Sequence, residues 1–243
     1  MSAAVVVLAK APVPGVAKTR LGRTVGDAAA ADLAAAALLD TLDACCAVFP
    51  PGRRVVALAG ELGPACRSRQ LRAALAGWQV TGQQPGSLGE RILGALRETH
   101  GLTGGPVVLL GMDTPHLEPR VLTDVVATVM TTGRPVLGPA LDGGWWVLAT
   151  ADPAQAKGIA AVAMSRADTF AATWHAVCRA AGPPATAPVM RDVDTADDAA
   201  WVASEAPRTR FARAWAGHGH QPFGEPPQVA TEPVASAQTV GVP

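Results

Sequence analysis

The chain has 243 residues, of which 49% are hydrophobic and 16% charged, a composition that predicts a globular protein with a substantial apolar core. Its 20 Lys and Arg residues balance its 20 Asp and Glu residues, so no overall positive field favours nucleic acid or an anionic membrane as a partner. The opening run AAVVVLA is too short for a secretion signal, and no apolar stretch reaches the roughly 20 residues of a membrane span, so we expect a cytoplasmic protein.

Short runs of apolar and β-branched residues recur along the chain, with stretches of helix-forming residues between them. The runs span residues 4–9, 53–59, 78–83, 106–113, 135–140 and 145–150. Several are apolar throughout rather than alternating, which is typical of strands covered by helices on both faces. We therefore predict a single α/β domain, a three-layer α/β/α sandwich with a mostly parallel sheet.

The intervening stretches have the composition and the end signals of helices. The first expected helix starts at Asp27 in an alanine-rich segment, and the third opens with Ser87 and Glu90 at the spacing of a capping box. After residue 150 we expect a helix over 165–182, a last strand over 187–195 and a terminal helix broken at Pro207. The domain is assigned to residues 1–216, and the Pro- and Gly-rich segment 217–243 is predicted to be disordered.

The segment after the first expected strand, LAKAPVPGVAKTRLGR, combines rigidity with positive charge. Gly15 permits close backbone approach and two prolines stiffen the turn, which carries the cations Lys10, Lys18, Arg20 and Arg23. Ligands of open α/β sheets bind beyond the carboxyl ends of the strands, so we interpret this segment as a phosphate-binding loop. It has neither the Walker A nor the GxGxxG pattern. The alternative interpretation is that these cations are exposed to solvent and bind no ligand.

Acidic residues follow two further strands. Asp113 ends the apolar run PVVLLGMD, where a carboxylate either holds one coordination position of Mg²⁺ or caps the following turn. Asp192 and Asp194 alternate on the last expected strand and project to the same side, where they repel each other unless a cation lies between them. We assign these two to a metal site. Asp197 and Asp198 suit the first turn of the next helix, because the helix dipole favours acids there.

Two glycine-containing segments are candidate walls of a substrate site. Asp142, Gly143 and Gly144 lie between two strands, where the paired glycines either let the backbone approach a ligand or form a simple hairpin turn. The segment GQQPGSLGER starts a helix, and it either grips a nucleoside or forms an ordinary capped helix with an exposed ion pair. Its candidate residues are Gly86, Gly89, Glu90 and Arg91.

Taken together, these motifs resemble those of the nucleotide-diphospho-sugar transferase (GT-A-like) superfamily. Within it, AKAPVPGxxKTRL, LGER, GxDxPxL and GPxxDGG resemble the signature of the bacterial group known as DUF2064 or rSAM/selenodomain-associated transferase 1. The motifs are also similar to those of 2-phospholactate (phosphoenolpyruvate) guanylyltransferase and, more distantly, of molybdenum cofactor guanylyltransferase. The resemblance covers roughly residues 3–202 and implies a GT-A-like fold.

The resemblance also implies roles for individual residues. Lys18, Arg20 and Asp113 would be catalytic, the two cations by holding phosphates, and Mg²⁺ or Mn²⁺ would bind to Asp113, Asp192 and Asp194. The nucleotide-binding set would be Lys10, Gly15, Gly86, Leu88, Gly89 and Glu90. The acceptor would meet the DGG turn, with the set Asp142, Gly143, Gly144 and Trp145. The family more often has Tyr where this chain has Trp145, so the resemblance does not identify the acceptor.

We expect an enzyme whose partners are a nucleotide and a small-molecule acceptor. In nucleotidyl transfer, a phosphate or carboxylate of the acceptor attacks the α-phosphorus of a nucleoside triphosphate and releases pyrophosphate. In glycosyl transfer, the alternative, a nucleotide-sugar is the donor. Glycosyltransferases of this superfamily usually carry D-x-D at the end of the mid-sheet strand. The corresponding segment here, GMDTP, has the single acid Asp113, so we favour nucleotidyl transfer. A non-catalytic nucleotide-binding protein is the second alternative.

Overall fold

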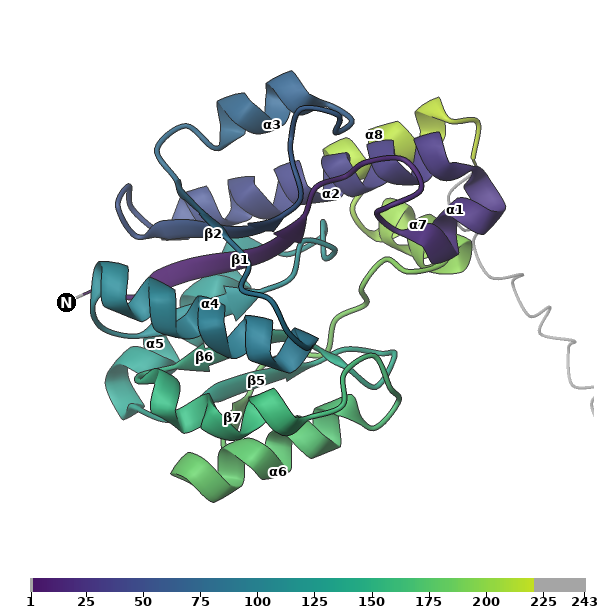
Figure 1. The fold of residues 1–243 in the computed structure, drawn as a ribbon. Helices are drawn as coiled ribbons and strands as arrows, with labels where there is room; N and C mark the ends of the chain where they lie inside the picture. Colours follow the sequence, from purple (N-terminus) through teal and green to yellow (C-terminus); the bar gives the residue numbers. More distant parts are fainter. Residues whose placement is uncertain (1, 221–243) are drawn as a thin grey trace, which may run out of the picture.

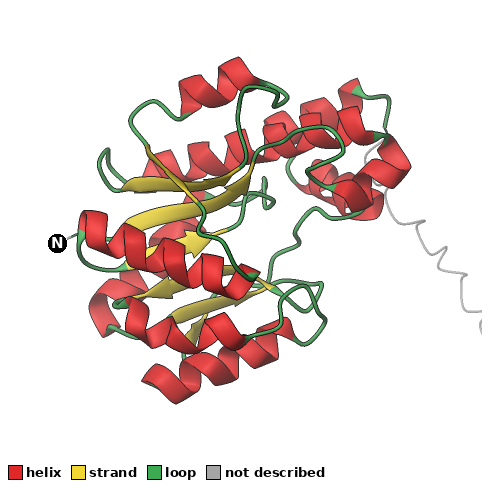
Figure 2. Cartoon of the chain, in the orientation of Figure 1, coloured by secondary structure: helices red, strands yellow, loops and turns green. Residues whose placement is uncertain are grey.

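The computed structural model describes residues 2–220, with a seven-stranded sheet between two layers of helices (Figures 1 and 2). Residues 221–243 of the tail predicted to be disordered lie outside the described residues. In chain order the strands are β1 (Ala4–Lys10), β2 (Arg54–Ala59), β3 (Gln79–Gly82), β4 (Val107–Leu110), β5 (Val136–Pro139), β6 (Trp145–Thr150) and β7 (Ala185–Thr186). Within residues 2–220, none of the helices combines the length and the apolar character that crossing a bilayer requires.

The strands are ordered β3-β2-β1-β4-β6-β5-β7 across the sheet. Four pairings are parallel, β1 with β2 and β4, β2 with β3, and β5 with β7, whereas β6 is antiparallel to both β4 and β5. The predicted three-layer α/β/α fold with a mostly parallel sheet is therefore confirmed. Val7 pairs with Val56 on one side and with Leu110 on the other, so the carboxyl ends of β1, β2 and β4 meet at one edge.

The helices pack in three groups, each around its own apolar core. They are α1 (Thr19–Val25), α2 (Asp27–Val48), α3 (Ser68–Ala74), α4 (Leu88–Thr103), α5 (Pro119–Thr132), the 3₁₀ helix η1 (Pro153–Ala161), α6 (Thr169–Ala181), α7 (Ala196–Glu205) and α8 (Arg210–Gly217). One face of the sheet packs on α2, α3 and α5, and the other on α4, η1 and α6. The third core joins α1, α7 and α8 to the outer side of α2.

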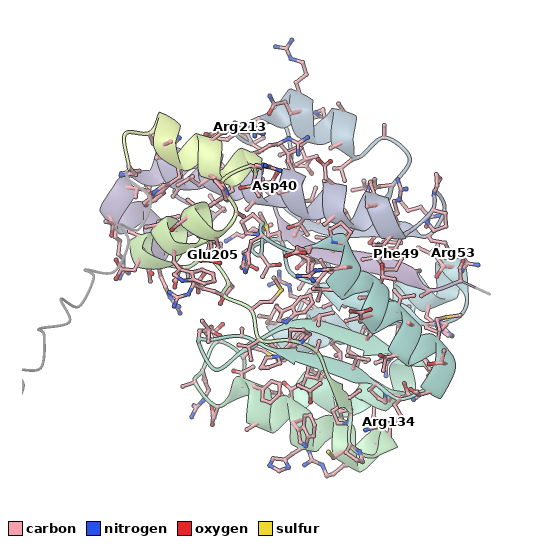
Figure 3. The ribbon with its side chains drawn as sticks, turned by 180° about the vertical axis from the view of Figure 1, so that it is seen from behind. Asp40, Phe49, Arg53, Arg134, Glu205 and Arg213 are labelled. Carbon is pink, nitrogen blue, oxygen red and sulfur yellow. The ribbon has the colours of Figure 1, made fainter. Side chains whose placement is uncertain are left out.

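Helix α2 is buried along two sides, and its alanine-rich sequence suits that position. Alanine has the highest helix propensity and lets neighbouring elements approach closely. Leu38 belongs to the core on one face of the sheet, whereas Leu33 belongs to the third core, which also contains Phe211 of α8. Asp40, also on α2, accepts hydrogen bonds from the first backbone amides of α8 and so holds that helix in place (Figure 3).

Two local expectations were wrong. The segment predicted to be a phosphate-binding loop is a loop only up to Lys18, because residues 19–25 form the short helix α1, which buries Leu21 in the third core. No strand spans 187–195. After β7 the chain runs irregularly to α7, and only Met190 forms a bridge, to Ala140. The predicted break near Pro207 is confirmed, since α7 ends at Glu205 and α8 begins at Arg210.

Candidate active site at the carboxyl ends of the central strands

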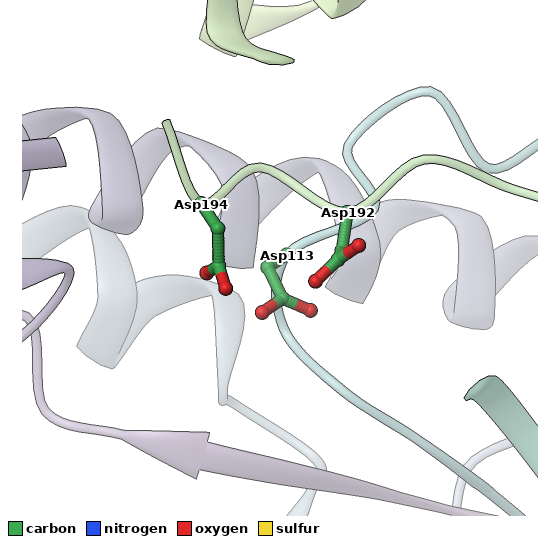
Figure 4. A group of neighbouring side chains, drawn as sticks. All are labelled: Asp113, Asp192 and Asp194. Carbon is green, nitrogen blue, oxygen red and sulfur yellow. The ribbon is translucent and has the colours of Figure 1, made fainter. Parts of the chain in front are cut away.

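Three aspartates from distant parts of the chain meet beyond β4. Asp113 follows β4, and Asp192 and Asp194 lie on the irregular segment before α7, with oxygen atoms of all three within 4.8 Å of one another (Figure 4). The two segments are joined by a hydrogen bond of 3.0 Å from the amide of Val193 to the carbonyl of Asp113. Although the expected strand is absent, Asp192 and Asp194 still alternate with buried Val193 and reach the same side.

The ammonium of Lys18 lies inside this cluster. Its Nζ is 2.7 Å from Oδ2 of Asp113 and 2.7 Å from Oδ1 of Asp194, and the side chain is only 13% exposed. Arg20 contacts the other oxygen of Asp194, with Nη1 3.2 Å from Oδ2. Burial alone lowers the pKa of Lys18, but attraction and hydrogen bonds from the two carboxylates outweigh it, so the pKa is raised. Lys18 therefore stays protonated and positively charged among the acids.

Asp192 is the least compensated of the three acids. Its carboxylate has neither a hydrogen bond nor an ion pair with any residue of the range 2–220. Burial, and then the negative charges of Asp113, Asp142 and Asp194, raise its pKa to about 7. In Asp194, burial raises the pKa, but the charge and hydrogen bond of Lys18 exceed that effect and lower it. The acids thus keep an excess of negative charge, and their oxygen atoms are the ligands that Mg²⁺ and Mn²⁺ prefer.

A cavity of about 790 Å³ opens beside the acids. Of the residues proposed from the sequence, those in its wall are Lys10, Lys18, Arg20, Leu88, Asp113, Asp142, Gly144, Trp145, Asp192 and Asp194. Arg91, a candidate from the GQQPGSLGER segment, also lines the cavity, and so do residues that were not proposed from the sequence, chiefly Gln83, Trp146 and the segment 164–167 before α6. Its size suits a ligand as large as a nucleotide.

The proposed residues Gly89 and Gly143 do not line this cavity, because other parts of the chain pack against them. A Cβ atom on Gly89 would lie 2.3 Å from the carbonyl oxygen of Ile159 in η1, and one on Gly143 would lie 2.2 Å from that of Ala167. Both glycines therefore serve close packing.

The other proposed residues outside the cavity wall also have local contacts. Glu90 completes the predicted capping box of α4, since its carboxylate accepts from the amide of Ser87 at 2.7 Å. Gly15 has φ +72°, and a Cβ atom there would lie 3.4 Å from the carboxylate of Asp27. Gly86 lines a second cavity of about 720 Å³ beyond β2 and β3.

The wall shared by the two cavities contains Lys10, Gln83 and Arg91. The amide nitrogen of Gln83 donates to the carbonyls of Ala9 and Ala57, both at 2.8 Å, and its oxygen accepts from the guanidinium of Arg91. This arrangement fixes Arg91 against the ends of β1 and β2. The only signal in the sequence was the position of Gln83 just after a strand, which is too common to identify such a bridge.

The predicted DGG turn is both a hairpin turn and a cavity wall. It connects β5 to β6, and the amide of Gly144 donates to the carboxylate of Asp142 at 2.7 Å. The indole of Trp145, which follows the turn, donates to the hydroxyl of Thr173 on α6 at 3.1 Å. The two alternatives left open by the sequence are therefore compatible, and the role of these residues toward an acceptor remains a prediction.

Comparisons with known proteins agree with this fold. A family model described as "Uncharacterized protein conserved in bacteria (DUF2064)" matches residues 41–166, just over half of the chain. The structure of a candidate nucleotide-diphospho-sugar transferase from Desulfovibrio desulfuricans G20 is similar, with 23% identity, 90% of this chain and 96% of that chain covered, and a TM-score of 0.74. CMP:2-keto-3-deoxy-manno-octonic acid synthetase complexed with CTP is similar at 12% identity, with 80% and 94% covered and a TM-score of 0.50. No curated protein matches the chain significantly.

Proposed function

The chain belongs to the DUF2064 family and has the fold of nucleotide-diphospho-sugar transferases, and from this premise we propose that it is a metal-dependent nucleotidyltransferase. The observation that supports the proposal is the gathering of three carboxylates and two cations at the carboxyl ends of the central strands, in the wall of a nucleotide-sized cavity. Ligands of open α/β sheets bind at this edge.

The residues present suit a divalent metal ion. Asp113, Asp192 and Asp194 offer oxygen ligands within reach of one another, and the carboxylate of Asp192 forms no ion pair with any described residue. A bound Mg²⁺ or Mn²⁺ would neutralise charge on the phosphates of the substrate. Lys18 and Arg20 line the same cavity and would hold those phosphates.

In the proposed reaction an oxygen anion of the acceptor attacks the α-phosphorus of a nucleoside triphosphate. A new phosphorus–oxygen bond forms while the bond to the β-phosphate oxygen breaks, and pyrophosphate leaves with that electron pair. A phosphate or carboxylate acceptor is already an anion, so no general base is required. The contribution of the protein is then alignment of the reactants and charge stabilisation.

The cavity has two sides, which suggest where the two substrates bind. Leu88, Gln83 and Arg91 line it near β1 and α4, and we assign this side to the nucleoside. Asp142, Gly144 and Trp145 line the opposite side, next to the segment 164–167, and we assign this side to the acceptor. Arg166, in that segment, offers a cation suited to a negatively charged acceptor.

Glycosyl transfer from a nucleotide-sugar is the second candidate function. The similar D. desulfuricans protein is described as a candidate nucleotide-diphospho-sugar transferase, and the same acids and cations would hold a nucleoside diphosphate as the leaving group. Nucleotidyl transfer is favoured because Asp113 is the single acid in GMDTP.

A thermal-shift panel of nucleoside triphosphates and nucleotide-sugars, each with and without Mg²⁺, tests the proposal. A ligand at a hundredfold excess over its Kd raises the free energy of unfolding by about 2.7 kcal/mol. We expect Mg²⁺-dependent stabilisation by one triphosphate, lost in Asp113→Asn and retained in Asp197→Asn, an exposed acid on α7. Stabilisation by a nucleotide-sugar alone would indicate glycosyl transfer. If no nucleotide stabilises the protein in a metal-dependent way, the proposal is wrong.

A further inference from the structure

The Lys18 ammonium contacts two of the three carboxylates proposed to bind metal. We propose that Lys18 is a stand-in cation: in the nucleotide-free protein it occupies the acid cluster and opposes metal binding, and it leaves for the phosphates when a nucleotide binds. This inference rests on the proposed function and deepens it. Its consequence is that the metal ion binds together with the nucleotide rather than before it.

The geometry makes the ammonium and a metal ion competitors. Lys18 uses Oδ2 of Asp113 and Oδ1 of Asp194, each at 2.7 Å, while Arg20 uses Oδ2 of Asp194. Both oxygens of Asp194 are thus engaged by cations. A divalent ion would need carboxylate oxygens at about 2.0–2.1 Å, beside a positive charge that repels it.

The charge balance also favours replacement rather than addition. Lys18 and Arg20 supply two positive charges beside three carboxylates, which leaves negative charge uncompensated, mainly at Asp192, whose carboxylate has no hydrogen bond or ion pair within residues 2–220. A doubly charged ion compensates more of it than Lys18 does. The free site therefore keeps an attraction for a divalent ion, and the lysine weakens that attraction without abolishing it.

Lys18 lies at the border between the acid cluster and the cavity. It precedes α1 with φ 49° and ψ 45°, a left-handed conformation that is uncommon for a residue other than glycine. Its long side chain lines the same cavity as Lys10 and Arg20, where phosphates are proposed to bind. A short rotation of the side chain toward the cavity exchanges carboxylate oxygens for phosphate oxygens, with no loss of charge pairing.

Binding of Mn²⁺ alone, followed through the electron paramagnetic resonance signal of free Mn²⁺, tests the inference. The variant Lys18→Met removes the charge and keeps most of the stem. We expect it to bind Mn²⁺ about tenfold or more tightly than the wild type, because the competing charge is gone. Lys10→Met is the matched control, since Lys10 lines the same cavity and forms no ion pair within the described residues. We expect it to bind Mn²⁺ like the wild type.

Thermal melting with a chelator provides a second readout. Lys18→Met leaves three carboxylates together without their lysine, so its Tm should fall below that of the wild type and recover with Mn²⁺ more than the wild type does. Lys18→Gln serves in the same assays if the methionine variant does not fold.

The outcomes separate this inference from the proposed function. Equal or weaker Mn²⁺ binding by folded Lys18 variants, with metal-dependent nucleotide stabilisation intact in the wild type, overturns the inference and leaves the function standing. Tighter binding by both Lys18 variants and the Lys10 control shows a general charge effect and also overturns it. Absence of any metal-dependent nucleotide stabilisation in the wild type overturns the proposed function itself.

Discussion

At the scale of single residues, the acid cluster combines one paired and one unpaired carboxylate on the same segment. Asp194 contacts Lys18 and Arg20, which lower its pKa against the effect of burial, whereas Asp192, two residues away, has a pKa raised to about 7. Functional sites commonly contain titratable groups whose environments move their pKa values apart. Both carboxylates are partly buried, but Lys18 donates a hydrogen bond to Asp194, whereas Asp192 has no such bond and the neighbouring carboxylates raise its pKa further.

The raised pKa of Asp192 predicts how stability depends on pH in metal-free protein. Between the ordinary Asp pKa of 3.8 and about 7, the folded state binds more protons than the unfolded state, so stability falls as pH rises. Above that range the full cost of the ionised carboxylate is present. We expect Asp192→Asn to raise stability at pH 8 by about 1–2 kcal/mol, after allowance for partial solvent screening, and to have little effect near pH 4.

Melting curves of the wild type and of Asp192→Asn, recorded in a chelating buffer from pH 4 to pH 8, measure the difference in stability as a few degrees of Tm. Asp197→Asn is the control, because Asp197 is exposed on the first turn of α7. A loss of Tm at every pH in Asp192→Asn would show that the ionised carboxylate stabilises the fold instead.

At the scale of elements, α4 illustrates what a local pattern predicts and what it misses. The capping box of Ser87 and Glu90 is formed by residues close in sequence and was predicted correctly. The role of Gly89 depends on η1, which lies about seventy residues later in the chain, where the carbonyl of Ile159 leaves no room for a side chain. The LGER motif led to the prediction that Gly89 binds the nucleoside. In the structure, Gly89 packs closely against the backbone of η1.

Two glycines of α4 give opposite predictions for the same substitution. Gly89→Ala forces backbone of η1 away from α4 and should lower the free energy of unfolding by roughly 1–3 kcal/mol. Gly101→Ala meets no atom within 4 Å and should raise it by up to about 1 kcal/mol, because alanine restricts the unfolded chain and favours helix. Urea denaturation measures both. Equal effects of the two substitutions would contradict the packing role of Gly89.

At the scale of the whole molecule, the sheet was predictable and the site was predictable only in its parts. Apolar runs identified six strands because burial on both faces leaves a local record. The ion pairs of Lys18 join residues 95 and 176 positions apart, and no local pattern encodes such a contact. The sequence identified Lys18 and Asp194 as separate candidates, and only the folded chain shows that they touch.

The third core brings these two residues together from opposite ends of the chain. It contains Leu21 of α1, which follows Lys18, and Val193, which precedes Asp194, together with residues of α2, α7 and α8. Docking of α8 on α2 therefore supports the acid cluster from a distance. Asp40 is central to that docking, since it accepts from the amides of Arg210 and Phe211 at 3.0 and 2.9 Å.

Asp40→Ala should loosen this docking. It removes two hydrogen bonds to the start of α8 and a contact with the Arg210 side chain, so we expect a loss of about 1–2 kcal/mol of stability and faster amide exchange in residues 210–217. Asp43→Ala is the matched control, because the Asp43 side chain is 58% exposed and, among residues 2–220, its carboxylate pairs only with Arg210, so its loss should cost less than about 0.5 kcal/mol. Denaturant titration and hydrogen exchange of the two variants distinguish them. If they behave alike, α8 is held by Phe211 and Trp215 in the core, and the carboxylate of Asp40 contributes little.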